Sequence, residues 1–354
     1  MTITSITAFK KLCPIKRPYT ITRNTFTEVE IVFLEIELQN GIRGIGASST
    51  DVNVVGESAE DTLNNLRSDS VMELAGKDIR NFLPLIKRFR QQFFSFPGTQ
   101  AAIDIALHDA FCRWLGMPVV DFYGRYHDKL LTSVTIGIKD VAETLEEAQE
   151  YFERNFRALK IKTGLDVKQD AERIIRLREK YRDHFFIRVD ANTGYNLQQL
   201  QEFMDLTREL DVELIEQPLL PGMENELRKL PPESRARLAA DESLKNATSA
   251  LQLTHHVPYG IFNIKLMKCG GILGAFDIAT VARQADISLF WGCNDESIVS
   301  ITAAVHAAYA SPNTRYLDLD GSFDLADDLV KGGFILKDGY ILPKNEPGLG
   351  VTKL

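Results

Sequence analysis

The sequence has few cysteines, no long apolar run and no excess of positive charge. Its four cysteines are spread over 354 residues without a CxxC pair, so we expect free thiols rather than a disulfide framework. No stretch approaches the roughly 18 apolar residues of a membrane span, and residues 1–12 lack the apolar core of a signal peptide. We therefore predict a cytoplasmic protein that does not interact with membranes.

The balance of charges bounds the partners of this chain. A net charge of −8 at pH 7 argues against nucleic-acid binding, which requires a basic surface that displaces counterions from phosphates. The composition, 44% hydrophobic and 25% charged, is that of a globular protein with a full-sized core. A length of 354 residues predicts a barrel-sized domain and a smaller partner domain.

The first 125 residues have the pattern of strands followed by helices. Alternating segments at 2–11 and 27–39 precede an Asn-Gly pair at Asn40 and Gly41, and a further alternating segment follows at 42–47. Asn-Gly between alternating runs is a strong hairpin signal, which predicts an antiparallel meander. Helical patterns follow at 59–74, 81–93 and 99–115. We predict an α+β capping domain over residues 1–125.

From residue 133 the pattern changes to short β-rich runs at a nearly constant interval. Eight such runs begin 24 to 27 residues apart, which leaves room for one helix between successive strands. Eight βα units predict an α/β fold, a modified (β/α)₈ barrel over residues 126–321. Short strand patterns with turns fill residues 322–354, and we expect this tail to return to the capping domain. The runs begin at Ser133, Ala158, Phe185, Val212, Arg237, Ile261, Ile287 and Thr314.

Three acidic residues occupy matching positions at the ends of successive runs. Asp190, Glu216 and Asp241 end the third, fourth and fifth runs. In a barrel of this kind the C-terminal strand ends carry the chemistry, and three carboxylates meeting there repel one another unless a cation lies among them. Ligand sets made only of oxygen favour Mg²⁺. The sequence therefore predicts a magnesium site.

Lysines end the second and sixth runs. Lys160 and Lys162 are two residues apart, so the period of a strand directs both side chains inward. In the sixth run Lys265 and Lys268 are three residues apart and cannot both face inward. We choose Lys265, which would face Lys162 across the cavity. We expect Lys268, near a Gly-Gly turn, to be a loop or solvated charge.

The eighth run ends in an acidic pair. Asp318 and Asp320 are two residues apart and share a face of the strand. Such a pair could bind a cationic group of a ligand, or it could cap a helix or form ion pairs with a neighbouring loop. The spacing alone leaves these alternatives open.

With these residues placed, the sequence resembles the muconate-lactonizing subgroup of the enolase superfamily over nearly its whole length. The resemblance implies Mg²⁺ on the three acids, one ion per subunit, and acid/base roles for Lys162 and Lys265 on opposite sides of an α-carbon next to a carboxylate. It also implies a homo-oligomer. The motifs that carry the resemblance are KIK (160–162), RVDAN (188–192), EQP (216–218), ADES (240–243) and NIKLMKCGG (263–271).

Within the subgroup, the DLD motif at 318–320 resembles that of dipeptide epimerases. The resemblance implies that Asp318 and Asp320 hold the N-terminal ammonium of a dipeptide, which removes the ambiguity left by spacing. The segment GCNDES (292–297) also resembles the family. It implies substrate contacts near Cys293 and Asp295, and a supporting Glu296 close to Lys265.

The remaining predicted substrate contacts are Lys160, Thr135 and Arg23. Lys160, beside Lys162, carries a like charge that disfavours protonation of the catalytic lysine. Thr135 lies on the first barrel strand. Arg23 belongs to the segment 15–28, which we expect to be a capping-domain loop over the barrel mouth.

We therefore predict an isomerase, a Mg²⁺-dependent epimerase that inverts the C-terminal residue X of an Ala-X dipeptide. X is glutamate if Arg23 pairs with its side chain, or a small or apolar residue if Ile21, Phe26 and Val54 line the pocket. The alternative within the superfamily is a muconate-type cycloisomerase or an o-succinylbenzoate synthase, whose substrates carry no ammonium. A Schiff-base aldolase would also place a lysine inside a barrel. A non-catalytic scaffold has no reason to keep the three acids and two lysines.

Overall fold

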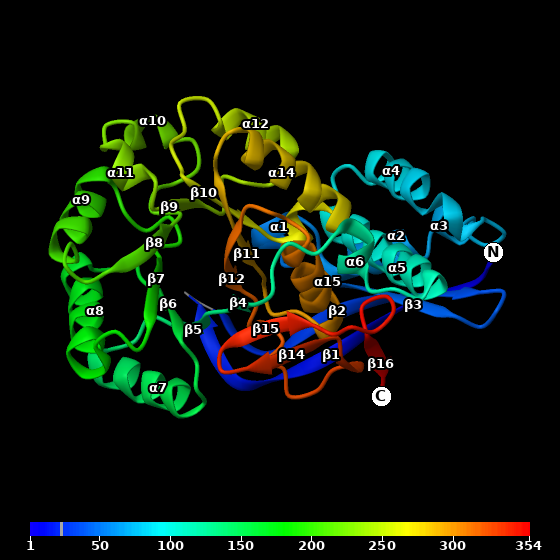
Figure 1. Cartoon of the computed structure of the whole chain (residues 1–354), viewed down its shortest axis with the longest axis horizontal. Coiled ribbons are helices and arrows are strands. Elements are labelled where there is room, and N and C mark those ends of the chain that lie inside the picture. The colour runs from blue at the N-terminus through cyan, green and yellow to red at the C-terminus, as the bar shows by residue number, and fades with distance from the viewer. Residues whose placement is uncertain (22–23) are drawn as a thin grey trace.

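The computed structural model describes residues 1–21 and 24–354, and for residues 17–21, 24–26 and 53 it describes the backbone alone. A capping part built of strands and helices lies beside a barrel of parallel strands (Figure 1). The predicted architecture is confirmed: a nearly closed eight-stranded barrel with helices outside it and an N-terminal capping domain.

The capping sheet is an antiparallel meander of β1 (Ile3–Ile21), β2 (Asn24–Leu38) and β3 (Arg43–Ser48), in that order. The turn at Asn40 and Gly41 occurs where it was predicted, with φ +81° at Gly41. Helix α5 (Pro97–Leu115) packs directly on β3. A Cβ at Gly46 would lie 1.9 Å from the carbonyl oxygen of Ala102, so only glycine permits this close approach.

The prediction of a loop over residues 15–28 is wrong for the residues that the structure describes. Strands β1 and β2 continue into this segment and pair at Tyr19 with Phe26 and at Ile21 with Asn24. The β-branched Thr20 and Thr25, which pair with each other, favour extended backbone over a loop. Arg23 lies outside the described residues. The arm that β1 and β2 form runs past the segment after the last barrel strand, where the N–H of Lys16 donates to the carbonyl of Asp324 at 2.7 Å.

The capping helices differ slightly from the sequence prediction. The pattern at 59–74 forms two helices because Ser68 interrupts it as the N-cap of the second. The helices are α1 (Val52–Val55), α2 (Ala59–Leu66), α3 (Asp69–Met72), the 3₁₀ turn η1 (Ile79–Asn81), α4 (Phe82–Gln92), α5 and α6 (Val119–Tyr123).

The eight barrel strands follow the predicted runs and are hydrogen-bonded in sequence order, all parallel. A bridge between Thr132 and Leu317 joins the first strand region to the last. The strands are β5 (Val134–Ile136), β6 (Ala158–Lys162), β7 (Phe186–Asp190), β8 (Val212–Glu216), β9 (Leu238–Ala240), β10 (Ile261–Ile264), β11 (Ser288–Gly292) and β12 (Thr314–Asp318).

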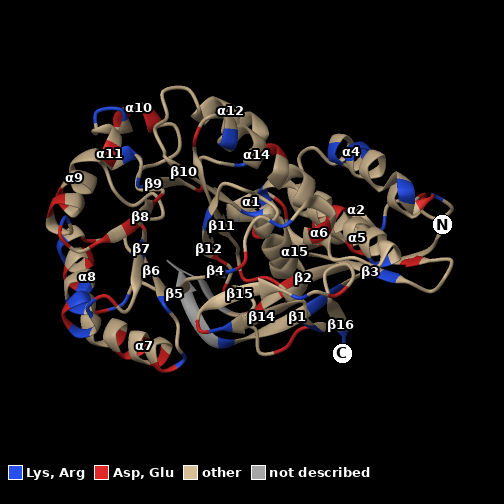
Figure 2. Ribbon diagram, viewed as in Figure 1, with Lys and Arg blue, Asp and Glu red and all other residues tan. Residues whose placement is uncertain are grey.

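Helices cover the outside of the barrel, and Figure 2 shows basic and acidic residues interspersed along α8, whereas the charged residues of α7 and α9 are acidic. Among the described residues, no helix is long and apolar enough to cross a membrane. The barrel helices are α7 (Val141–Glu153), α8 (Val167–Tyr181), α9 (Leu197–Leu206), α10 (Glu224–Leu227), α11 (Pro232–Arg235), α12 (Ala247–Leu253), α13 (Leu266–Cys269), α14 (Ile272–Gln284) and α15 (Ile298–Tyr309).

The C-terminal tail contacts the capping part. Asp109, buried on α5, accepts hydrogen bonds from the N–H of Ile45 at 2.9 Å and of Leu349 at 2.7 Å, so one carboxylate joins β3, α5 and the tail. The exact limits 1–125, 126–321 and 322–354 stay our proposal for the domain boundaries. The tail strands are β13 (Val330–Gly332), β14 (Phe334–Lys337), β15 (Tyr340–Pro343), which also pairs with β4 (Leu130–Leu131), and β16 (Val351–Lys353).

One buried histidine makes stability depend on pH. His306 on α15 is fully buried, its Nδ1 accepts the N–H of Val120 at 3.0 Å, and burial lowers its pKa to about 3. The unfolded chain, in which the pKa is near 6.5, therefore takes up a proton first as the pH falls. Between pH 7.5 and 5 this histidine should remove about 2 kcal/mol of stability.

Urea unfolding at both pH values tests this expectation. A His306→Asn variant keeps an acceptor near the position of Nδ1 and should lose about 2 kcal/mol less than the unmodified protein over the same interval. Equal losses in the two proteins would contradict the assignment of a neutral buried imidazole.

Candidate active site

The three predicted metal acids lie together at the C-terminal ends of β7, β8 and β9. Asp190 and Glu216 are register partners, and Asp241 follows the end of β9 directly. All three are buried, with exposed fractions of 1%, 0% and 4%. Burial and the neighbouring charge of Asp190 raise the pKa of Glu216 to about 8. Burial acts in the same direction on Asp190, but Lys160 and Lys162 outweigh it and lower the pKa of that carboxyl.

Lys160 bridges the carboxylates of three strands. Its Nζ lies 3.1 Å from Asp190 Oδ2, 2.8 Å from Glu216 Oε2 and 2.9 Å from Asp318 Oδ2. The lysine is buried. Burial lowers its pKa, but the three carboxylates outweigh this and hold the pKa above its usual value. Lys160 is therefore a fixed cation between the metal acids and the strand-eight pair.

The two predicted catalytic lysines come from opposite sides of the barrel, because β6 and β10 are the second and sixth of its eight strands. Lys162 Nζ lies 2.7 Å from Asp190 Oδ2 and 2.9 Å from Asn192 Oδ1. Lys265, immediately after β10, has its Nζ 3.1 Å from Asp241 Oδ2. Burial lowers the pKa of Lys265, but the negative charge of Asp241 outweighs this and raises it.

The prediction that Lys268 is a loop or solvated charge is wrong. Lys268 is buried, with 8% of the residue exposed, and its Nζ contacts both the carbonyl oxygen and Oδ1 of Asp241. The chain leaves the extended conformation at Lys265 and forms the single turn of α13. A helical spacing of three residues places Lys265 and Lys268 on the same side, whereas the strand period would separate them.

The strand-eight acids lie next to β5. Ser133 Oγ donates to Asp318 Oδ1 at 2.6 Å, and the N–H of Thr135 donates to Asp320 Oδ2 at 2.7 Å. Burial together with the charges of Asp318 and Asp324 raises the pKa of Asp320 to about 8. The negative charge at this end of the barrel thus exceeds what Lys160 compensates, and the site favours a further cation.

The seventh-strand segment also reaches this site. Cys293 Sγ lies 3.3 Å from the carbonyl oxygen of Asp318 and 3.9 Å from Asp320 Oδ1. The carbonyl of Asp295 accepts from Ser49 Oγ at 2.5 Å, so the capping part contacts this loop. Glu296 is buried, and burial raises its pKa to about 7 while the charge of Lys265 opposes the shift.

Two residues that were not predicted from the sequence hold the metal acids in place. Asn263 Nδ2 donates to Glu216 Oε1 at 2.6 Å, and Gln217 Oε1 accepts the N–H of Asp241 at 2.9 Å. Asn263 precedes Lys265 by two residues, so the period of a strand could have placed it on the inward face. Gln217 adopts a φ of +33°, and no local sequence pattern predicts this backbone conformation.

The chemistry of the donor set fits a divalent cation. Glu216 Oε2 is buried and accepts no hydrogen bond of normal geometry, although Lys160 Nζ is 2.8 Å away. In the conformation shown, no three His, Cys, Asp or Glu side chains of the described residues form a closed metal cluster, because lysine ammonium groups lie among the carboxylates. Three buried carboxylates with only oxygen donors nevertheless match the preference of Mg²⁺.

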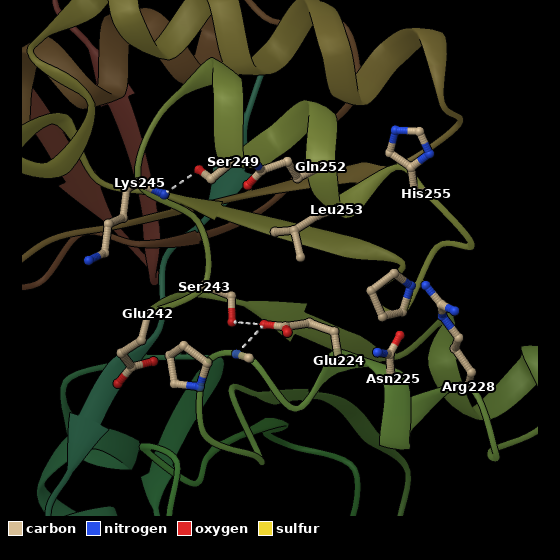
Figure 3. Close-up of a pocket in the computed structure, with 13 residues that line it drawn as sticks. Glu224, Asn225, Arg228, Glu242, Ser243, Lys245, Ser249, Gln252, Leu253 and His255 are labelled. Carbon is tan, nitrogen blue, oxygen red and sulfur yellow. Dashed lines mark hydrogen bonds between the residues drawn. The ribbon is translucent and has the colours of Figure 1, made fainter.

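A pocket of 410 Å³ lies beside this cluster, between the loops that follow β8 and β9 (Figure 3). Its wall is held by Ser243 Oγ, which donates to Glu224 Oε1 at 2.7 Å. Lys162, Lys265 and the metal acids do not line it. Glu242 stands at the edge of the pocket in Figure 3 and is the lining residue next in sequence to Asp241.

Comparison with known proteins gives the same architecture. The family described as enolase C-terminal domain-like matches residues 143–353, and the mandelate racemase / muconate lactonizing enzyme N-terminal domain matches residues 3–124. The chain belongs to the enolase superfamily. The predicted membership is therefore confirmed over both parts of the molecule.

Relatives of this enolase-superfamily chain are named epimerases. An L-Lys-D/L-Arg epimerase of Desulforapulum autotrophicum is 50% identical over 355 residues, which cover 100% of both chains. A second L-Lys-D/L-Arg epimerase, from Methylococcus capsulatus, is 47% identical over 340 residues, or 96% of both chains. Epimerases are isomerases, so the predicted enzyme class is confirmed.

A solved structure is similar to this superfamily member over nearly all of its length. The dipeptide epimerase of Methylococcus capsulatus, complexed with Mg and the dipeptide L-Arg-D-Lys, superimposes with a TM-score of 0.97 at 46% identity. The match covers 99% of this chain and 100% of that one. The metal in that complex is the one that the sequence predicted.

Proposed function

We propose that the protein is a Mg²⁺-dependent dipeptide epimerase that acts on cationic dipeptides composed of lysine and arginine. The observation that carries the proposal is the placement of Lys162 and Lys265 on opposite barrel strands, on either side of three buried carboxylates. Two bases that face one another can remove a proton from one side of an α-carbon and return it to the other.

Asp190, Glu216 and Asp241 would hold the magnesium ion. When bound, Mg²⁺ would polarise the substrate carboxylate and compensate the acidic charge that raises the pKa of Lys265. Asn263 and Gln217 keep two of these acids in place through the hydrogen bonds to Glu216 and to the backbone of Asp241.

The lysines carry out the proton transfer. One lysine, in its neutral form, takes the α-proton of the C-terminal residue, and the other, protonated, donates a proton to the opposite face. For the opposite epimer the roles are exchanged. Asn192 Oδ1, 2.9 Å from Lys162 Nζ, accepts a hydrogen bond from the amino group and orients it. The net change is inversion of one stereocentre without loss of any group.

Asp318 and Asp320 would bind the N-terminal ammonium of the dipeptide. Lys160 already contacts Asp318 Oδ2 at 2.9 Å. Asp320 is instead contacted by the N–H of Thr135 and the thiol of Cys293, and among the described residues no Lys or Arg forms an ion pair with it. An ammonium placed there lowers the cost of ionising Asp320. A muconate or succinylbenzoate substrate offers no such group, so the acidic pair favours an epimerase over those alternatives.

The dipeptide that we propose differs from the Ala-X prediction. The two relatives at 50% and 47% identity are named for lysine and arginine, and the similar solved structure contains L-Arg-D-Lys. Asp318 and Asp320 account for the N-terminal ammonium of a dipeptide, so the lysine and arginine side chains of the proposed substrate rest on these relatives.

Isotope exchange tests the proposal. With Mg²⁺ in D₂O, L-Lys-L-Arg and L-Arg-L-Lys should each gain one deuterium at the C-terminal α-carbon and give both epimers. L-Ala-L-Ala and L-Ala-L-Glu should exchange at least about 10-fold more slowly, the equivalent of about 1.4 kcal/mol. A chelator should abolish exchange, and added Mg²⁺ should restore it.

Two outcomes of the exchange experiment would contradict separate parts of the proposal. Faster exchange of L-Ala-L-Glu than of the cationic dipeptides would refute the substrate, and exchange that persists in excess chelator would refute the metal. Roles for Arg23, Thr135, Cys293, Asp295 and Glu296 stay predictions, as do a homo-oligomeric state and a cytoplasmic location.

A further inference from the structure

Lys268 is a buried cation beside the active site, and it has no role in the proposed proton transfer. Its Nζ donates to the carbonyl oxygen of Asp241 at 2.6 Å and also contacts Oδ1 of the same residue. The other carboxylate oxygen, Oδ2, lies 3.1 Å from Lys265 Nζ. The two oxygens of Asp241 are thus divided between two lysines with different surroundings.

The backbone of Asp241 is held on both sides. Its N–H donates to Gln217 Oε1 at 2.9 Å, and its carbonyl accepts from Lys268. With Oδ1 engaged as well, rotation of the carboxylate about its side-chain bonds would break a charge-assisted hydrogen bond in a buried place. Lys268 therefore restricts Asp241 to one orientation.

The position of Lys268 is fixed in turn by the capping part. Helix α13 ends at Gly270 and Gly271, which have φ values of +80° and +97°. A Cβ on Gly270 would lie 2.3 Å from Gln100 Oε1, and a Cβ on Gly271 would lie 2.6 Å from the Asp104 side chain. Both residues belong to α5. Two glycines thus allow the turn that carries Lys268 to pack directly against the capping helix.

Lys268 also borders a groove that the catalytic lysines do not line. It lines a groove of 510 Å³ between the capping helices and the start of α12, together with Val54, Phe94 and Lys245. Lys162, Lys265 and the metal acids do not line this groove. The ammonium group of Lys268 is already engaged by two oxygen atoms of Asp241, so we assign it no part in the proton transfer.

We infer that Lys268 is a positioning residue for the magnesium site, which would hold the Asp241 carboxylate in the orientation that binds the ion. Outer partners of metal ligands commonly change metal affinity by about 10- to 100-fold when they are removed. The inference rests on the assignment of Asp241 as a ligand in the proposed function, but not on which dipeptide is the substrate.

Magnesium titration by calorimetry tests this role. Lys268→Met should bind Mg²⁺ about 10- to 100-fold more weakly than the unmodified protein. Its epimerase activity should return when the Mg²⁺ concentration is raised in proportion, because the proton-transfer lysines are intact. Lys229→Met is the matched control: Lys229 is exposed and forms an ion pair with Glu226, so its removal should change neither quantity.

Two results would overturn the inference. One is unchanged Mg²⁺ affinity in Lys268→Met, and the other is lost activity that saturating Mg²⁺ does not restore. If the methionine variant does not fold, Lys268→Arg and Lys268→Gln replace it. The Lys268→Arg variant keeps a positively charged donor and should bind Mg²⁺ more tightly than the Lys268→Gln variant. Equal or reversed affinities of the two variants would also refute the role.

Asp241→Asn separates this inference from the metal assignment itself. If this variant binds Mg²⁺ as the unmodified protein does, Asp241 is not a ligand, and the proposed metal site fails together with the inference. If Asp241→Asn loses Mg²⁺ while Lys268→Met keeps it, the inference about Lys268 alone fails.

Discussion

Replacing either lysine that flanks the metal acids by alanine should lower epimerization by about 1,000-fold or more, within the range usual for loss of a general acid or base. Because Lys162 and Lys265 come from opposite sides of the barrel, each variant loses access to only one face of the α-carbon. Lys162→Ala should still exchange the α-proton of one epimer with D₂O, and Lys265→Ala that of the other. Proton NMR of each epimer in D₂O measures both quantities.

Mg²⁺ titration provides the control for these variants. Both should still bind the ion, since the three proposed carboxylate ligands are intact. Exchange of both epimers by both variants, or full epimerization by one of them, would show that another group moves the proton.

The second large effect is expected from Asp320, through the KM of the substrate. Asp320→Asn should raise the KM of a cationic dipeptide by about 10- to 100-fold, because a charge-assisted hydrogen bond to the substrate ammonium contributes roughly 1.5–3 kcal/mol. Its effect on kcat should be smaller, since Asp320 lies beside Thr135 and Cys293 rather than beside the lysine pair. Steady-state kinetics by optical rotation separate the two constants.

A substrate that lacks the N-terminal ammonium is the matched probe. The unmodified enzyme should discriminate strongly between the dipeptide and its deaminated analogue, and Asp320→Asn should lose most of that discrimination. If the substitution weakens both substrates equally, Asp320 supports the fold of the site and does not bind the ammonium.

The barrel was largely predictable from the sequence because each strand carries a local signal. Buried parallel strands form short apolar runs, and their regular spacing alone predicted eight βα units. The acids at the strand ends were predictable for the same reason: Asp190 and Glu216 occupy equivalent positions of neighbouring strands, and the register of the sheet brings equivalent positions together.

The departures occur where tertiary contacts override a local pattern. Lys268 was predicted to be a loop charge because its neighbours Gly270 and Gly271 indicate a turn. In the structure these glycines allow the turn after α13 to pack against α5. The segment 15–28 was expected to be a loop over the barrel mouth, but β1 and β2 continue to pair there. In both cases the deciding contact joins residues far apart in the chain, which the pattern of one segment does not encode.

The residues that support the metal acids were hidden for a related reason. Asn263 and Gln217 act through side-chain hydrogen bonds to Glu216 and to the backbone of Asp241. An amide on a strand carries no signal of its partner until the neighbouring strand is placed. At Gly292 a Cβ would lie 2.6 Å from Asn263 Oδ1, so even the space for this amide depends on a third strand.

The carboxylate of Asp109 imposes an order on the biogenesis of the molecule. It joins the N–H of Ile45 to that of Leu349, which lies in a distant part of the chain. A ribosome delivers residue 45 long before residue 349, so during synthesis this buried acid lacks one of its two backbone donors while the barrel emerges. The capping domain, although encoded first, reaches its final form only after residue 349 has left the ribosome.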